Sequence, residues 1–328
     1  MTRIIHFGTN LGFAKYVWGP EAVLDIARER LGLKAVELVT DNDFGPAFHL
    51  IDREAFVRHH GAVGHYARSK NMRISSVFTF YRDGGAVAHP DPAIRAAAQQ
   101  ALYSLADEAA AVGAPYACAS FMTALRDDFD RDPRACQDRA FHAWAEWMTY
   151  ARIAGLQGLL VEMSAQARED FATIEQTRST LKRLQDYHQA HPDTTAPVEL
   201  CYDVGHGMAL EESPDKSDRD FRAWFRAFPM SIREVHLKNT DIDFLATWPF
   251  TPAYEKTGIV QPQEIIAAVR DILEGEVYLM LEIAGKRGRE AGERQILEDL
   301  TISVDVWKRA LQAEGYRERA DGAWEFCR

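Results

Sequence analysis

The sequence predicts an α/β protein built as a single (β/α)8 barrel, the TIM barrel architecture. Short runs rich in apolar and β-branched residues alternate with longer amphipathic segments along the chain, and eight such pairs can be counted. The length of 328 residues exceeds the roughly 250 residues of one typical barrel and falls short of two. No G-x-G-x-x-G motif follows the first predicted strand, which disfavours the open doubly wound sheet that the same alternation allows.

The predicted strands include several nearly continuous apolar runs, as parallel strands covered on both faces require. They are Ile4–Thr9, Ala35–Val39, Arg73–Phe80, Tyr116–Phe121, Gly158–Met163, Val198–Asp203, Ile232–Lys238 and Val277–Ile283. Between them lie segments with helical periodicity, such as Ile94–Val112 and Ala140–Ala154.

Prolines and glycines support these helices. Proline suits the first helical turn, where a missing N–H has no partner to lose, and glycine suits the residue after a helix. The prolines near expected helix starts are Pro20, Pro92, Pro133 and Pro262. The glycines near expected helix ends are Gly32, Gly113 and Gly155.

The chain shows no linker or low-complexity tract that would divide it. We expect the barrel to cover residues 1–314 and the tail, residues 315–328, to pack on the barrel or on a neighbouring subunit. The irregular stretch from Asn239 to about Val260 is rich in aromatic residues and proline. We interpret it either as a lid over the barrel mouth or as a contact in an oligomer.

The charge and composition of the chain indicate which classes of partner to expect. The net charge is −11, from 38 basic and 49 acidic residues, and the basic residues form no dominant patch, so we expect neither nucleic acid nor a membrane as a partner. No apolar run reaches the ~18 residues of a membrane helix, and no cleavable signal precedes the first strand, so we expect a cytoplasmic protein. The four cysteines form no C-x-x-C pair and are expected to be free thiols.

The candidate site consists of polar residues within the last four predicted strands. Each lies at or near the carboxyl end of its strand, the face on which barrel active sites are built. They are Glu162, Asp203, His236 and Glu282. Three carboxylates and an imidazole can bind a divalent cation through oxygen and nitrogen. The alternative is that each is a separately satisfied polar group of the core or surface.

This pattern resembles the xylose isomerase-like TIM barrel superfamily, in its sugar phosphate isomerase/epimerase branch, which includes D-tagatose 3-epimerase. The resemblance covers nearly the whole chain in order of elements and is most specific in the second half. It implies that Glu162, Asp203, His236 and Glu282 bind one divalent metal ion, with Mn²⁺ first and Mg²⁺, Co²⁺ or Zn²⁺ as alternatives. It also implies that His206, in the run Asp203-Val204-Gly205-His206, contacts a substrate oxygen, although a histidine that starts a helix has the same pattern.

The resemblance implies an enzyme that isomerises or epimerises a small ketose or ketose phosphate, with Glu162 and Glu282 removing and returning a proton next to the ketone. Within the family, the tetrulose-phosphate 3-epimerases are most similar in general appearance. A sugar or inosose dehydratase on the same fold and a non-catalytic metal-dependent sugar-binding protein remain alternatives. A homo-oligomer is compatible with the sequence.

Further residues suggest substrate contacts. Lys238 lies two positions beyond His236, on the same face of its strand, and is placed either to hold a substrate oxygen or to lie on the surface. Lys286 and Arg289 belong to a glycine-interrupted loop after the last strand, where barrels often bind phosphate, although a solvated loop has the same composition. Phe13 and Trp18 are expected to line the pocket.

Overall fold

The computed structural model describes residues 4–14, 17–40, 52–79, 86–206, 215–242, 246–283 and 293–327. By its internal contacts the chain divides into two units. Unit 1 comprises residues 1–37, 67–73 and 202–328, and unit 2 comprises residues 38–66 and 74–201. Each unit is described by itself below.

Eight parallel strands follow one another in sequence order along the sheet, from β2 to β8, and β1 is bonded to both β8 and β2. They are β1 (Ile4–Asn10), β2 (Ala35–Val39), β3 (Arg73–Phe78), β4 (Tyr116–Ser120), β5 (Gly158–Glu162), β6 (Val198–Asp203), β7 (Ile232–Leu237) and β8 (Glu276–Leu281). An eight-stranded parallel sheet whose first strand pairs with both the second and the last has the connectivity of a closed barrel. The predicted (β/α)8 fold is therefore confirmed, with strand ends differing from prediction by no more than two residues.

The helices alternate with the strands in the order expected. They are α1 (Pro20–Asp25), α3 (Arg53–Ser69), α4 (Pro92–Val112), α5 (Arg126–Arg131), α6 (Pro133–Ala154), α7 (Ile174–Ala190), α8 (Phe221–Ala227), α9 (Pro262–Ile272) and α10 (Glu293–Ala313). Each of the four singled-out prolines begins a helix, at α1, α4, α6 and α9. Gly113 and Gly155 end α4 and α6 in the left-handed conformation, which lacks a steric penalty for glycine.

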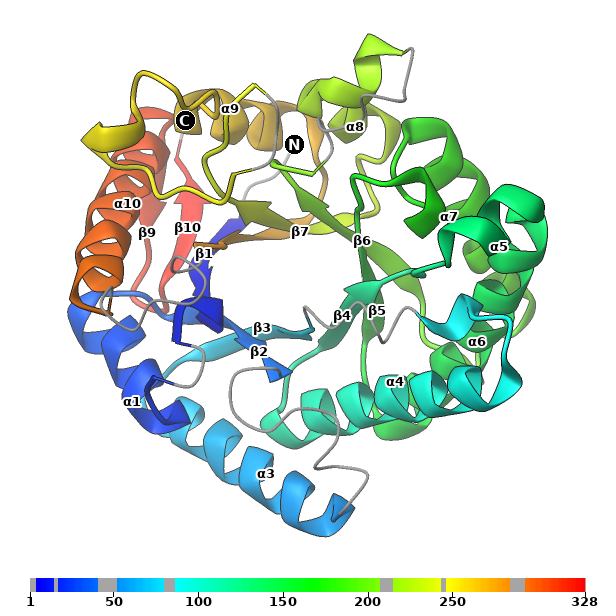
Figure 1. Ribbon diagram of the computed structural model, residues 1–328. Coiled ribbons are helices and arrows are strands. Elements are labelled where there is room, and N and C mark those ends of the chain that lie inside the picture. The colour runs from blue at the N-terminus through cyan, green and yellow to red at the C-terminus, as the bar shows by residue number, and fades with distance from the viewer. Residues whose placement is uncertain are drawn as a thin grey trace. The chain divides into compact units, whose positions relative to one another are not determined.

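In unit 1, β1 pairs with β8 and β8 pairs with β7, each in parallel register. Helices α8, α9 and α10 follow one another along one side of these strands, with α9 packed between α8 and α10 (Figure 1). The α9 helix buries Ile265, Ile266 and Val269, one face of an amphipathic helix. This packing fixes the strands whose carboxyl ends carry the candidate site.

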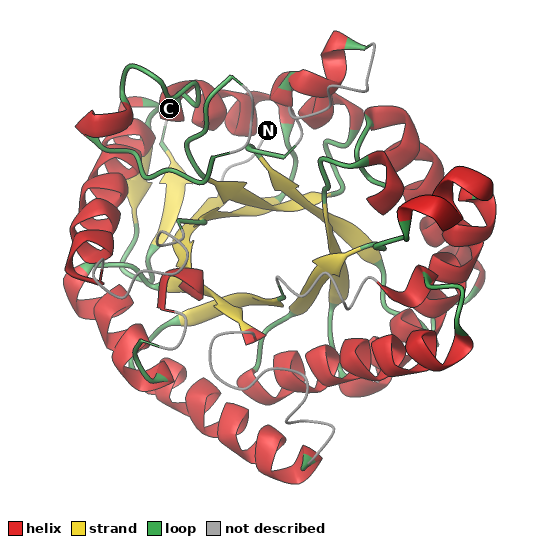
Figure 2. Ribbon diagram, viewed as in Figure 1, coloured by secondary structure: helices red, strands yellow, loops and turns green. Residues whose placement is uncertain are grey.

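In unit 2, β4 pairs with β3 and β5, and β5 pairs with β6. Helices α4, α5, α6 and α7 all lie on one side of β4 and β5 (Figure 2). The opposite faces of the strands supply a buried apolar layer, made of Val39, Phe78, Cys118, Leu160 and Cys201.

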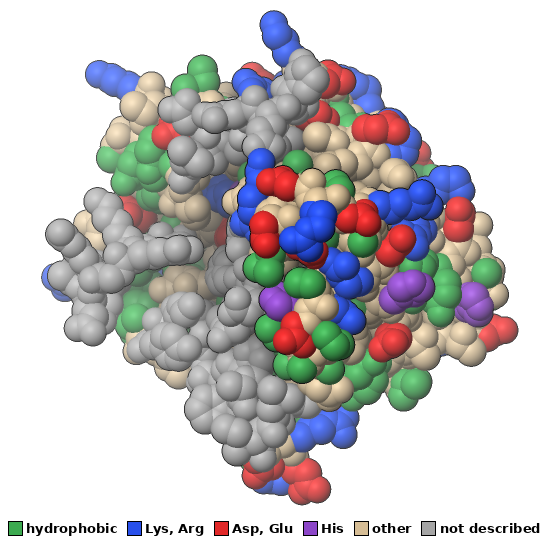
Figure 3. All heavy atoms as spheres, turned by 45° about the vertical axis from the view of Figure 1, so that its right-hand side comes forward, with side chains coloured by type: hydrophobic (Ala, Val, Ile, Leu, Met, Phe, Trp, Pro, Cys, Tyr) green, Lys and Arg blue, Asp and Glu red, His purple; other side chains and the backbone are tan. Residues whose placement is uncertain are grey.

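The surface formed by α5, α6 and α7 mixes basic and acidic side chains (Figure 3). Several of them form ion pairs, such as Lys182–Asp186 at 2.6 Å along α7 and Arg183–Asp138 at 2.6 Å between α7 and α6. Opposite charges are thus interspersed on this face, without a single-sign field of the kind that attracts a polyanion.

The tail forms two further strands, β9 (Tyr316–Glu318) and β10 (Ala323–Phe326). β10 pairs with β9 and also runs antiparallel to β1, with Ile5 opposite Trp324. Trp324 is buried, so this hairpin belongs to the packed part of unit 1. The sequence analysis did not predict these strands, because the tail carries no alternating pattern of useful length.

The segment after β7 is anchored at its base. Asn239 pairs with Trp248 in an antiparallel bridge, and its side-chain oxygen accepts hydrogen bonds from the backbone N–H groups of Thr240 and Val260. Trp248 stacks on Tyr254 with ring centroids 4.9 Å apart.

None of the helices that the structure describes combines the length and the hydropathy of a membrane-spanning segment.

Candidate metal centre

Three of the four predicted ligands come together in unit 1. Asp203 is the last residue of β6, His236 is the penultimate residue of β7, and Glu282 directly follows β8. All three are buried, and one ligand atom of each lies within 4.8 Å of the others. Parallel strands place their carboxyl ends at the same edge of a sheet, which explains why residues so far apart in sequence meet.

Lys238 extends into this cluster. Its Nζ donates to Asp203 Oδ2 at 2.5 Å and to Glu282 Oε2 at 3.3 Å, and it lies 3.2 Å from Nε2 of His206. Its side chain is only 4% exposed, so the ammonium is a buried cation between two buried carboxylates. The predicted alternative of a surface lysine is therefore wrong, because the residue points inward from the end of β7.

Gly205 makes room for Lys238. A Cβ atom at this position would lie 2.4 Å from Cε of Lys238 and would have to displace it. The backbone N–H of Gly205 also donates to Oδ1 of Asp203 at 2.6 Å, which fixes the carboxylate. A larger residue at this position would therefore shift the lysine side chain from its place beside Asp203.

The charged groups around Asp203 lower the pKa of its carboxyl group. Burial by itself would raise the pKa of Asp203, but the charges of His206, Lys238 and His236 outweigh it and lower the pKa. His206 Nδ1 lies 3.3 Å from Oδ2 of Asp203. Asp203 is therefore an ionised carboxylate, as a metal ligand must be.

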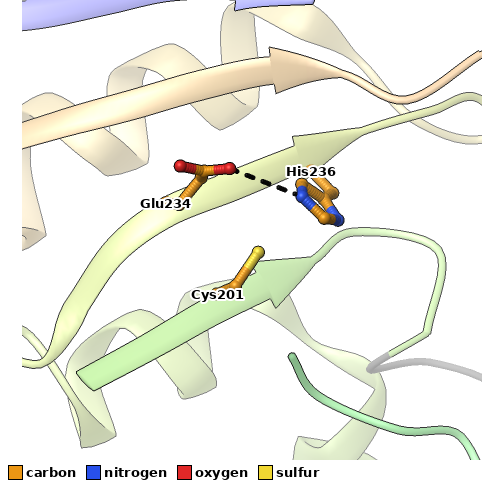
Figure 4. A group of neighbouring side chains, drawn as sticks. All are labelled: Cys201, Glu234 and His236. Atoms are coloured by element: carbon orange, nitrogen blue, oxygen red, sulfur yellow. Dashed lines mark ion pairs between the residues drawn. The ribbon is translucent and has the colours of Figure 1, made fainter. Parts of the chain in front are cut away.

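On its other side, His236 meets buried acidic groups that the sequence analysis did not single out. Nε2 of His236 lies 2.9 Å from Oε2 of Glu37 in β2. The same nitrogen lies 3.6 Å from Oε1 of Glu234, two residues earlier in β7, and Figure 4 draws this second pair. Burial raises the pKa of Glu37 to about 8, with Glu234 adding to the rise and His236 opposing it. An isolated acid within an apolar strand, the signal that identified Glu162, also marks Glu37.

Glu162 is the last residue of β5 and lies in unit 2. It is buried and stands in register with Ser120 of β4 and Cys201 of β6. The following loop is held by Ser164, whose hydroxyl donates to Glu169 at 2.5 Å. The predicted strand-end position of Glu162 is thus confirmed.

The remaining predicted contacts have mixed outcomes. Phe13 is buried in a short 3₁₀ helix, η1 (Leu11–Ala14), and Trp18 is partly exposed. The ring centroids of Phe13 and Trp18 lie 6.3 Å apart. The two aromatic residues pack on each other, and their role in a pocket stays a prediction. Lys286 and Arg289 lie outside the described residues.

The chain is similar in sequence and in fold to known sugar epimerases. A D-erythrulose 1-phosphate 3-epimerase from Brucella abortus is 28% identical over 222 residues, which are 67% of this chain and 69% of that protein. Among solved structures, a provisionally assigned xylose isomerase from Rhodospirillum rubrum has a TM-score of 0.79 at 24% identity, covering 93% of this chain and 99% of that one. A D-psicose 3-epimerase from Clostridium cellulolyticum, solved with D-tagatose, has a TM-score of 0.66 at 14% identity, covering 93% and 99%. At these identities the structures show a likeness of fold.

The family model described as xylose isomerase-like TIM barrel matches residues 24–306, well over half of the chain. This match agrees with the strand order and confirms the family resemblance drawn from the sequence. The chain therefore belongs to the xylose isomerase-like TIM barrel family.

Proposed function

We propose that this protein is a divalent-metal-dependent epimerase or isomerase of a small ketose or ketose phosphate, with a tetrulose 1-phosphate as its preferred substrate. The observation that carries the proposal is the buried meeting of Asp203, His236 and Glu282 at the ends of successive strands. The similarity to a D-erythrulose 1-phosphate 3-epimerase supports the substrate class.

The donor set fits a divalent cation. Two carboxylates and an imidazole provide the mixed oxygen and nitrogen ligands that Mn²⁺, Mg²⁺, Co²⁺ and Zn²⁺ accept. The ammonium of Lys238 lies beside Asp203 and Glu282, and this contact supports a site that favours positive charge. We propose Mn²⁺ as the first choice among these ions.

We assign Glu162 as the fourth ligand. It is in register with Cys201 of β6, and Asp203 follows Cys201 by two residues on the same face of that strand. Residues diagonal across neighbouring strands are within reach of long side chains. A glutamate at the end of β5 is thus suited to join the aspartate at the end of β6.

Epimerisation next to a ketone requires a base, an acid and a group that stabilises negative charge. When bound, the metal ion acts as a Lewis acid that stabilises the charge developing on the substrate oxygens. Glu162 removes the proton from the carbon next to the ketone, and Glu282 returns a proton on the opposite face, or the two exchange these roles for the reverse substrate. Return to the same carbon gives an epimer.

Lys238 and His206 are proposed substrate contacts. Both carry N–H donors next to Asp203, and Lys238 is buried enough for its charge to act strongly on a bound oxygen. A ketose oxygen or a phosphate oxygen satisfies this donor pair. Phe13, Trp18, Lys286 and Arg289 complete the proposed substrate residues.

The test is solvent exchange in D₂O, with D-erythrulose 1-phosphate and C4–C6 ketoses supplied together with Mn²⁺ and followed by proton NMR. We expect deuterium to enter one C–H position as an epimer forms, and chelation of the metal to stop it. Glu162→Gln and Glu282→Gln should each reduce exchange by at least about 10²–10⁴-fold, because each removes a proton-transfer group.

Glu276→Gln is the matched control, since Glu276 lies at the other end of β8 and its side chain is 62% exposed. It should retain exchange. Loss of water from the sugar instead of epimer formation would identify a dehydratase. Sugar binding without any exchange would identify a binding protein, and either result would overturn the proposal.

A further inference from the structure

Glu37 places a buried carboxyl group inside an apolar strand, far from the predicted ligands in sequence. It sits in the middle of β2 with no exposed surface, and in register with Asn10 of β1. Burying a carboxylate is costly unless hydrogen bonds compensate for the lost water. Its position therefore calls for partners of defined geometry.

Two nitrogen atoms approach one oxygen of Glu37. Nδ2 of Asn10 donates to Oε2 at 2.5 Å, and Nε2 of His236 lies 2.9 Å from the same atom. The backbone N–H of Gly12 donates to Oδ1 of Asn10 at 2.7 Å, so the amide nitrogen of Asn10 must face Glu37. Asn10 thus holds the carboxylate, and the carboxylate faces the imidazole.

The two nitrogens of His236 therefore face different surroundings. Nε2 faces Glu37, whereas Nδ1 faces Glu282, with its Oε2 at 3.6 Å. A carboxylate that accepts one ring N–H fixes the tautomer and leaves the lone pair on the other nitrogen. The lone pair then lies on the side of the candidate ligands.

We propose that Glu37 is a positioning residue for His236: it accepts the Nε2–H bond and presents Nδ1 to the divalent cation. This inference rests on the proposed metal site and deepens it. Asn10 acts one step further out, by fixing the carboxylate of Glu37. Such outer partners typically change metal affinity by about 10–100-fold when removed.

The first experiment measures Mn²⁺ binding to metal-free protein by titration calorimetry, without any substrate. Glu37→Leu removes the acceptor, and we expect the dissociation constant to rise by about 10–100-fold. Glu37→Gln keeps a side-chain oxygen that can accept the bond, and should recover part of the affinity. An unchanged dissociation constant in a folded Glu37→Leu protein would overturn the inference.

The matched control is Glu108→Leu in unit 2. Glu108 is also buried and pairs with a histidine, His60, at 3.0 Å. This variant removes an equivalent buried pair outside the site, so its affinity for Mn²⁺ should stay within about twofold of wild type. A loss as large as that of Glu37→Leu would mean that general destabilisation, and not positioning, explains the effect.

A second readout needs no variant. In wild-type protein loaded with diamagnetic Zn²⁺ and labelled with ¹⁵N at histidine, the ring of His236 should carry its proton on Nε2 and bind metal through Nδ1. Ligation through Nε2 would overturn the inference even if Glu37→Leu fails to fold. Absence of any metal binding by wild type would instead refute the proposed function, so the two failures are distinguishable.

Discussion

Two regions of the molecule fill the buried faces of parallel strands with different chemistry. The ends of β6, β7 and β8 in unit 1 place charged side chains in contact, as Lys238 does with Asp203 at 2.5 Å. The apolar layer of unit 2 uses residues such as Leu160 and Phe78, whose buried side chains carry no charge. The same strand geometry thus carries charged contacts in one region and an apolar layer in the other.

The difference indicates which kind of interaction stabilises each region. An apolar layer stabilises through burial and tight packing, which do not depend on pH or ions. In a buried charged cluster, the attraction between opposite charges offsets the free energy lost when each charge leaves water. Removing one member therefore leaves the remaining charges buried without a partner. The two regions should therefore respond to different perturbations.

The largest expected effect is at the charged cluster. Lys238→Met removes the ammonium between Asp203 and Glu282, and without metal we expect the free energy of unfolding to fall by about 3–5 kcal/mol. At the proposed metal site Mn²⁺ would supply the missing charge, so added metal should restore more stability in this variant than it adds to wild type. Urea unfolding with and without Mn²⁺ measures both quantities.

Lys308→Met is the control for that variant, because Nζ of Lys308 donates only to the neutral carbonyl of Gly32 in the contacts described. It should lose less stability and gain nothing extra from metal. Equal responses of the two lysine variants would remove the contrast between the charged cluster and the rest of the molecule.

The apolar layer gives the next effect. Leu160 is fully buried in β5, and Leu160→Ala should lower the free energy of unfolding by about 2–5 kcal/mol through lost burial and a residual cavity. Its Mn²⁺ affinity should be unchanged. Ile153→Ala, at a residue 77% exposed, should change stability by less than about 0.5 kcal/mol in the same urea assay. A metal-dependent loss in Leu160→Ala would contradict the separation of the two regions.

The smallest effect lies at the opposite end of the unit 1 strands. Burial lowers the pKa of His6 below 6.5, and the hydrogen bond that His6 donates to the carboxylate of Glu276 opposes this by raising it. The unfolded chain then binds the proton more tightly, so stability is fully present above the unfolded pKa of about 6.5 and is lost as pH falls below it. Unfolding measured from pH 7.5 to 5.5 should show this slope.

His6→Gln isolates the contribution of this histidine. The variant should lose part of the slope while keeping the response of the charged cluster to Mn²⁺. The same slope in both proteins would show that His6 does not contribute to the pH dependence of folding.

The sequence by itself determined the eight strands of the barrel, several helix starts and the strand-end positions of the candidate ligands, but not the two strands of the tail. Apolar runs and prolines are local signals, and each of Pro20, Pro92, Pro133 and Pro262 begins its helix as predicted. The convergence of Asp203, His236 and Glu282 followed from one rule, that parallel strands end at the same edge.

Only the tertiary structure decided which groups touch. The pairing of Asn10 with Glu37 depends on the register of β1 against β2, and the approach of Glu37 to His236 joins residues about two hundred positions apart. The inward direction of Lys238 depends on the space left by Gly205. Local periodicity encodes elements, but contacts between elements depend on register and packing, which no single segment of the sequence specifies.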